Sequence, residues 1–152
     1  MALPNIFSKE VADDLVKRIN ALRPDTQPKW GKMSVGQMLA HCCVTYEMVY
    51  EDKHPAPGFF TKLMLNAFVK KIVLNEVPYK HNSRTGPQFL ITDARDFDRE
   101  KKRLIDYINK TQQLGGAHFD GKASLSFGPL NTTEWNNMFY KHLNHHLSQF
   151  GV

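Results

Sequence analysis

Residues 131–150 read NTTEWNNMFYKHLNHHLSQF, and this segment carries the clearest structural pattern in the chain. Asn131 and Glu134 have the spacing of a capping box, in which each side chain accepts a hydrogen bond from the other residue's backbone amide. Apolar residues then recur at the i, i+3, i+4 and i+7 spacing of an amphipathic helix: Trp135, Met138, Phe139, Leu143, Leu147 and Phe150. The segment therefore predicts a long closing helix with one buried face.

Two histidines of this helix fall within its apolar stripe. At about 100° per residue, His142 and His146 lie on the same face as Trp135, whereas His145 lies at the edge of that face. Residues four apart on a helix are neighbours, so the two imidazoles can converge on one point. An open metal site needs three protein ligands, so the pair requires a donor from another helix.

Four more helices are predicted upstream. Ser8 can cap a first helix that ends before Pro24, and Ser34 with Gln37 forms a capping box for a second helix that runs to about Tyr50. An amphipathic stretch covers about residues 60–72, and a further helix runs from about Asp96 to a glycine stop at residues 115–116. Residues 75–92 and 116–130 are predicted to be long irregular connections, and only Ala123 to Phe127 resembles a strand.

The expected class is therefore all-α, and the long connections favour a four-helix bundle with crossover connections plus a short extra helix. A chain of 152 residues suits one domain, predicted to span residues 1–152. The cysteines, Cys42 and Cys43, are adjacent and cannot form a relaxed disulfide, which indicates a reducing compartment. With no leader and no apolar run of about 20 residues, we expect a cytoplasmic protein that does not enter a membrane.

The formal charge of +5 and the pI near 9.2 favour anionic partners in general. Lysines and arginines are nevertheless spread along the chain, with acidic residues near most of them, so we do not expect nucleic acid as a partner. The stretch 60–72 carries Lys62, Lys70 and Lys71. We expect its apolar face to cover the core and these lysines to face water.

His41 is the expected third metal ligand. It shares the face of the second helix with Met38, Thr45 and Met48, where an imidazole without a partner would lose its hydrogen bonds. The alternative is that the three histidines are ordinary core residues bonded to carbonyls, tyrosines or each other. Cys42 is rotated about 100° from His41, so it is expected to be a buried apolar residue and not a ligand.

Four segments together resemble the DinB/YfiT-like metalloenzyme superfamily, and more narrowly a bacterial branch of it: residues 30–41 (WGKMSVGQMLAH), 127–130 (FGPL), 134–135 (EW) and 141–151 (KHLNHHLSQFG). The resemblance implies a four-helix bundle that holds a divalent metal ion, zinc or nickel, through His41, His142 and His146. Relatives with assigned activities include transferases that use small cytosolic thiols and a maleylpyruvate isomerase that uses such a thiol as cofactor.

Two functions follow from these observations. As an enzyme, the protein would act on a small-molecule substrate by thiol transfer or by hydrolysis, with a low-molecular-weight thiol as a second cofactor. Gln37, Thr45 and Gln149 are candidates for orienting the imidazoles, and Trp30, Phe127 and Tyr46 are candidates for the pocket wall. The other four histidines, His54, His81, His118 and His145, are expected to lie on the surface or in loops. As the alternative, the chain is a non-catalytic helical binding module with structural histidines, and under either reading a homodimer is an option.

Overall fold

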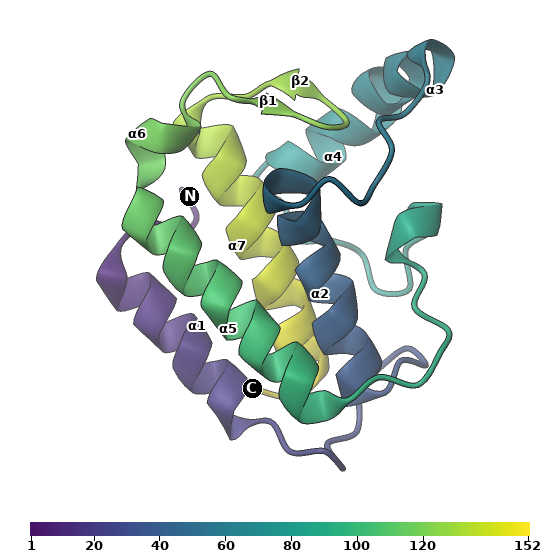
Figure 1. Cartoon of the computed structure of the whole chain (residues 1–152), viewed down its shortest axis with the longest axis vertical. Helices are drawn as coiled ribbons and strands as arrows, with labels where there is room; N and C mark the ends of the chain where they lie inside the picture. The colour runs from purple at the N-terminus through teal and green to yellow at the C-terminus, as the bar shows by residue number, and fades with distance from the viewer.

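The computed structural model describes residues 1–152 and is mainly α-helical (Figure 1). In chain order the elements are α1 (Lys9–Ala21), α2 (Val35–Tyr50), α3 (Phe59–Met64), a π-helical turn η1 (Leu65–Val69), α4 (Lys70–Leu74), a 3-10 turn η2 (Pro87–Phe89), α5 (Phe97–Leu114), α6 (Gly116–Phe119), β1 (Ala123–Ser124), β2 (Gly128–Pro129) and α7 (Thr132–Gln149).

The four longest helices lie alongside one another: α5 and α7 each contact both α1 and α2 (Figure 1). Each of these helices begins at a residue whose side chain accepts a backbone hydrogen bond from its first turn: Ser8, Ser34, Asp96 and Asn131. The two predicted capping boxes, Ser34 with Gln37 and Asn131 with Glu134, are both complete. The capping residues therefore set where these helices start, as the sequence predicted.

Aromatic side chains fill the centre of the core between these helices. Tyr46 of α2 stacks on Phe139 of α7, with ring centroids 5.1 Å apart, and Trp135 lies 5.5 Å from both Phe119 and Phe139. Cys42 and Cys43 are free thiols in the same core. Burial raises the pKa of the Cys43 thiol to about 12, and the pKa of Cys42 is also raised by burial.

The expectation for residues 60–72 is wrong in one respect: their apolar side chains do not cover the core. Residues 59–74, called the arm below, form α3, η1 and α4; α3 extends away from the four long helices, whereas α4 contacts α7 (Figure 1). Most of its large apolar side chains are exposed: Phe59, Phe60, Leu63, Met64, Phe68 and Ile72. Only Leu65, Val73 and Leu74 pack against the core, because the arm is anchored at its C-terminal end.

Lys141 of α7 provides much of that anchor. Its ammonium group is buried and donates hydrogen bonds to the carbonyl oxygens of Ile72 and Asn75, at 2.8 and 2.6 Å. These carbonyls belong to the end of α4, where the helix dipole favours a positive charge. The arm is thus fixed to α7 at one end.

The connection at residues 116–130 also departs from expectation, because it contains secondary structure. It forms the single turn of α6 and the antiparallel pair of β1 and β2, with Ala123 opposite Pro129. The predicted all-α class is therefore corrected to mainly α with one small two-stranded sheet. The predicted strand over Ala123 to Phe127 is present only at its first two residues, and the rest forms the turn.

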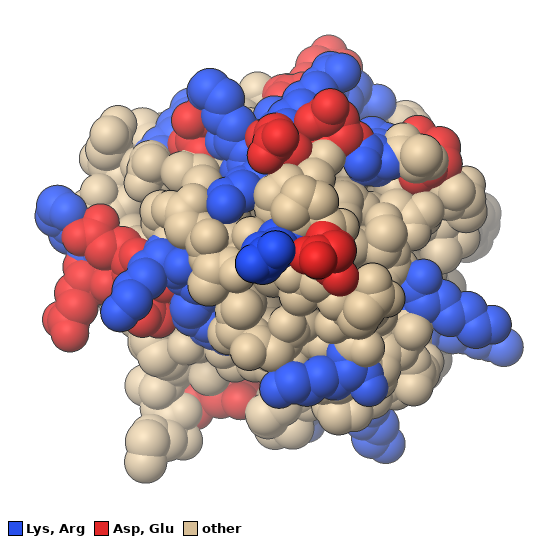
Figure 2. Space-filling view, turned by 90° about the horizontal axis from the view of Figure 1, so that it is seen from below, with Lys and Arg blue, Asp and Glu red and all other residues tan.

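Acidic and basic side chains alternate over the face seen in Figure 2. Exposed ion pairs one helical turn apart, such as Lys9 with Asp13 and Lys102 with Asp106, occur on α1 and α5. None of the helices combines the length and the apolar character needed to cross a membrane.

Candidate metal centre

Three histidines meet where α2 packs against α7. His41 comes from α2, and His142 and His146 come from successive turns of α7. One ligand nitrogen from each ring lies within 4.8 Å of the others, and the Nε2 atoms of His41 and His142 are 3.0 Å apart. The structure therefore brings together the three histidines that the sequence singled out.

Each imidazole makes a hydrogen bond through Nδ1, on the side of the ring away from this meeting point. His41 Nδ1 lies 2.8 Å from the carbonyl oxygen of Phe89, and His146 Nδ1 lies 2.8 Å from Oε1 of Gln149. Both partners are acceptors, so both Nδ1 atoms carry the proton, and Nε2 of each ring is left with its lone pair. This is the tautomer that a metal ligand needs.

His142 can carry its proton on either ring nitrogen. Its Nδ1 lies 3.0 Å from the Thr45 hydroxyl, which can donate or accept, and its Nε2 faces the lone pair of His41. When His142 carries its proton on Nε2, it donates to His41. When the threonine hydroxyl accepts from Nδ1 instead, all three Nε2 atoms present lone pairs to one point, which suits a cation.

Burial keeps the three imidazoles neutral. It lowers the pKa of His146 to about 3 and is the main cause of the lowered pKa of His41. The pKa of His142 falls well below its ordinary value, first through burial and then through the neighbouring His146 and His41. Because a metal ligand must be unprotonated, these nitrogens are available without competition from protons near neutral pH.

The spacing fits a tetrahedral ion. Zinc–nitrogen bonds of about 2.0–2.1 Å at tetrahedral angles place ligand nitrogens about 3.4 Å apart. That separation falls between the 3.0 Å contact of His41 with His142 and the 4.8 Å limit for the whole group. Small side-chain movements would therefore suffice for the three rings to bind one ion.

The three histidines lie in the wall of a cavity of about 970 Å³. Much of the remaining wall is apolar and comes from α2, α7, the arm, the connection that follows it and the turn between β1 and β2: Met48, Val49, Leu65, Val69, Val73, Phe89, Leu125, Phe127, Trp135 and Met138. Trp30 and Phe127 line the cavity, as expected. Tyr46 does not, because it lies one position beyond Thr45 on α2 and so points into the core.

The other polar candidates occupy different places. Thr45 and Gln149 contact His142 and His146, as described above, and Gln149 Nε2 also donates to the carbonyl oxygen of Trp30, 2.8 Å away. Gln37 contacts none of the three imidazoles. Its amide group completes the capping box with Ser34 and donates to the carbonyl of Asp93, which holds it outside the site.

The remaining histidines lie outside the group of three. His145 lines the same cavity, but its ring packs edge-on against Trp30 and Tyr79, and His81 stacks on Trp30 with centroids 3.7 Å apart. His54 forms a hydrogen bond with Glu47, and His118, on α6, forms one with Lys122.

The contact of His41 with the Phe89 carbonyl had no signal in the sequence. The acceptor is a backbone oxygen within η2, in a connection that was predicted only as irregular. A backbone carbonyl is present at every residue, so no side-chain pattern could have identified this one. The irregular connection at residues 75–92 thus supplies a hydrogen bond to the site.

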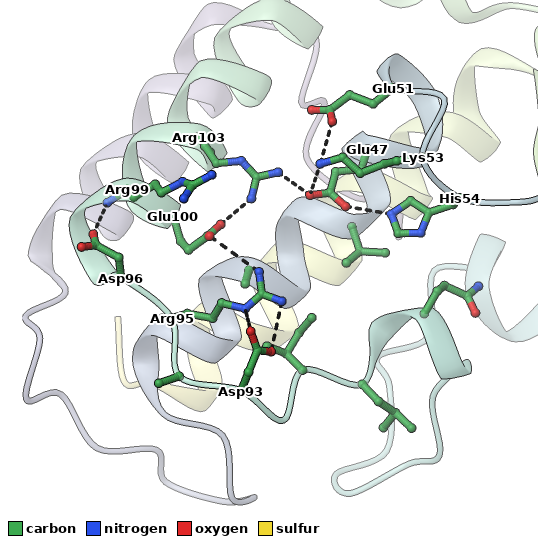
Figure 3. A pocket seen from close by; sticks show the side chains of 16 residues that line it. Glu47, Glu51, Lys53, His54, Asp93, Arg95, Asp96, Arg99, Glu100 and Arg103 are labelled. Atoms are coloured by element: carbon green, nitrogen blue, oxygen red, sulfur yellow. Dashed lines mark hydrogen bonds and ion pairs between the residues drawn. The ribbon is translucent and has the colours of Figure 1, made fainter.

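A second cavity, of about 790 Å³, shares Gln88, Leu90 and Ile91 with the first, so the segment around η2 contributes to the walls of both. Most of the charged side chains of this second cavity pair with one another (Figure 3). Arg103 of α5 bonds to the buried carboxylates of Glu47 and Glu100, and His54 Nε2 lies 2.7 Å from Glu47. Burial raises the pKa of Glu47, but its hydrogen bonds to His54, Arg103 and Lys53 outweigh that and leave the pKa below its ordinary value.

The fold and the site define a mainly α-helical protein with three clustered histidines, two buried and one half-buried, that could hold a metal ion. Residues 7–151 match the model of a family described as "Protein of unknown function (DUF1569)". The match covers nearly the whole chain, so the protein belongs to this family. Comparison with curated proteins and with solved structures finds no match.

Proposed function

We propose that the protein is a metal-dependent enzyme of the DinB/YfiT-like type, a four-helix bundle that acts on a small molecule by thiol transfer or hydrolysis. The observation that carries this proposal is the hydrogen bonding of the three imidazoles. His41 and His146 are held through Nδ1 by acceptors, so that Nε2 is free, and His142 has the Thr45 hydroxyl as its partner. Ordinary core histidines do not need three such arrangements around one point.

In this proposal His41, His142 and His146 hold a divalent ion, with zinc and nickel as the expected metals. The chemistry that such an ion supplies is Lewis acidity, which lowers the pKa of a thiol or of a water molecule. Phe89, Thr45 and Gln149 fix the orientations of the three rings, which keeps the ligand nitrogens directed at one point. These three residues come from separate parts of the chain: α2, η2 and α7.

The cavity wall supports the same proposal. Phe89, Phe127, Trp135 and Met138 exclude water from much of the space next to the histidines, and electrostatic effects are stronger where water is excluded. Three protein ligands leave a coordination position for a substrate or thiol, as in catalytic zinc sites. The arrangement is therefore suited to catalysis more than to a closed structural site.

Elemental analysis of protein purified without an affinity tag tests the metal site. We expect about one divalent ion per chain, which a chelator removes. His146→Ala should then lose most of the metal, whereas His145→Ala, a change of the same residue type at the next position, should keep it. Equal loss in the two variants would show that the assignment of ligands is wrong.

Cobalt substitution separates thiol chemistry from hydrolysis. A thiol that joins the site should add a sulfur-to-cobalt charge-transfer band when glutathione or coenzyme A is titrated into the cobalt protein. If neither thiol changes the spectrum, thiol transfer is excluded for these thiols, and turnover of ester, amide or lactone substrates would favour hydrolysis. A protein that binds no metal and shows no turnover would fit the non-catalytic binding module.

A further inference from the structure

The cavity around the three histidines contains no acidic side chain. Aspartate and glutamate make up 15 of the 152 residues, so 37 lining residues chosen at random would include about three or four of them. The wall includes much of the polar, exposed connection at residues 75–92, where acids would be tolerated. Their absence leaves the positive charges of this wall without compensation from within it.

Three basic residues line the same cavity: Lys32, Lys80 and Arg84. All three are exposed, which places them towards the opening, and the ion pairs of the molecule involve none of them. The second cavity has the opposite arrangement, because Lys53, Arg95 and Arg103 pair with carboxylates of the same wall, and only Arg99 makes no ion pair (Figure 3). Most of the positive charge is therefore neutralised in the second cavity, whereas Lys32, Lys80 and Arg84 are unpaired in the first.

The histidines add to this imbalance if the proposed function holds. Neutral imidazoles contribute no negative charge, so an ion held by them keeps its full positive charge. Such a charge in a wall without carboxylates attracts an anion strongly, and rim cations raise the local concentration of anions further. Cationic ligands are disfavoured for the same reason.

The apolar part of the wall adds a second requirement. Phe89, Phe127, Trp135 and Met138 offer a hydrocarbon surface, and the volume of about 970 Å³ is that of a pocket for an organic molecule. A small inorganic anion would leave this surface in contact with water. An organic body that covers this surface is stabilised because apolar surface is removed from water.

We infer that this cavity binds an organic anion whose apolar body lies against the wall and whose acidic group is held by the cations. The inference deepens the proposed function, on which the contribution of the ion rests, by naming the class of substrate. The contribution of Lys80 and Arg84 does not depend on the ion. The two sources of positive charge can therefore be tested separately.

The two tryptophans of the chain, Trp30 and Trp135, both line the cavity, so intrinsic fluorescence reports its occupancy. The test titrates zinc-loaded and chelator-treated protein with decanoate, decanol and decylamine, which share a ten-carbon chain and differ in charge. We expect saturable binding of decanoate at least about tenfold tighter than that of decanol, decylamine weakest, and a preference that shrinks with added salt. Metal content is measured on the same samples.

Two double variants test which cations are responsible for the preference for decanoate. Lys80→Gln with Arg84→Gln should weaken decanoate binding and leave decanol binding unchanged. Lys17→Gln with Lys102→Gln removes the same charge from exposed positions outside the cavity and should change neither. Phe60→Ser in the arm controls for binding of the probes to exposed apolar surface, and should leave the decanoate titration as it was.

The outcomes are distinguishable. Decanol that binds as tightly as decanoate, tighter binding of decylamine, or no saturable binding of decanoate would overturn the inference, even where metal analysis supports the proposed function. A preference for decanoate in protein that takes up no metal would support the inference through the rim cations and overturn the proposed function.

Discussion

Replacing Gln149 tests whether the hydrogen bonds around the imidazoles set metal affinity. The Gln149 side chain is buried and joins two parts of the site, accepting from His146 Nδ1 and donating to the carbonyl of Trp30, each at 2.8 Å. Gln149→Leu places an apolar side chain of similar size at this position and removes both hydrogen bonds. The imidazole of His146 then loses the group that fixes its orientation and its tautomer.

The expected magnitude follows from these two contacts. Loss of a hydrogen-bond partner behind a metal ligand lowers metal affinity by about 10–100-fold, which corresponds to about 1.4–2.8 kcal/mol. Each of the two buried groups left without a partner also costs about 1–3 kcal/mol of folding stability. The variant should therefore bind zinc more weakly and unfold at a lower urea concentration than the unchanged protein.

Gln149→Glu is the matched control. Its carboxylate can still accept the hydrogen bond from His146 Nδ1, but it cannot donate to Trp30. We expect zinc affinity within about threefold of the unchanged protein, together with reduced stability. Zinc affinity is measured by competition with a chromophoric chelator, and stability by urea unfolding of the metal-free protein. The reasoning is refuted if the leucine variant binds zinc as tightly as the unchanged protein, or if both variants lose affinity equally.

Three further changes test other parts of the structure. Gly31→Ala should weaken zinc binding in the same competition assay, because Gly31 has φ +82° and an added Cβ would lie 2.6 Å from Gln149 Nε2; unchanged affinity would contradict this. Arg103→Met should cost about 1.5–3 kcal/mol in urea unfolding, since it removes the charge-assisted hydrogen bonds that join the buried carboxylates of Glu47 and Glu100, and a loss below about 0.5 kcal/mol would show that the pairing is unimportant. The metal-free protein should lose stability as the pH falls from about 6.5, the ordinary histidine pKa, towards 5, because the unfolded histidines take up protons that the three buried ones, with their lowered pKa values, do not. A flat stability profile over that range would contradict the burial of neutral imidazoles.

The features predicted correctly from the sequence depend on local spacing. The positions of Ser34 and Asn131 relative to their partners three residues later determine where α2 and α7 begin. The same helical rotation places His142 and His146 on the face of α7 that meets α2. His41 could be added because it lies on an apolar face of its own helix.

The features that were missed depend on tertiary structure. The arm is amphipathic, but periodicity does not specify what an apolar face contacts, and Phe60 and Phe68 are exposed. Gln37 was a reasonable candidate near His41, yet its amide group is used by the cap of its own helix. The carbonyl of Phe89 reaches His41 only because the connection before α5 folds back over α2.

If the three histidines hold a metal ion as proposed, the burial of both thiols bears on which metal is bound. Cys42 directly follows His41, but both cysteines lie in the core with raised pKa values, so neither supplies a thiolate. A donor set of imidazoles alone suits zinc, copper, nickel and iron, because it contains no thiolate to select a soft metal, and the supply of each metal then contributes to which ion is bound. Under the proposed function, cells grown with added nickel and cells grown with added zinc should therefore yield the same fold with different metals.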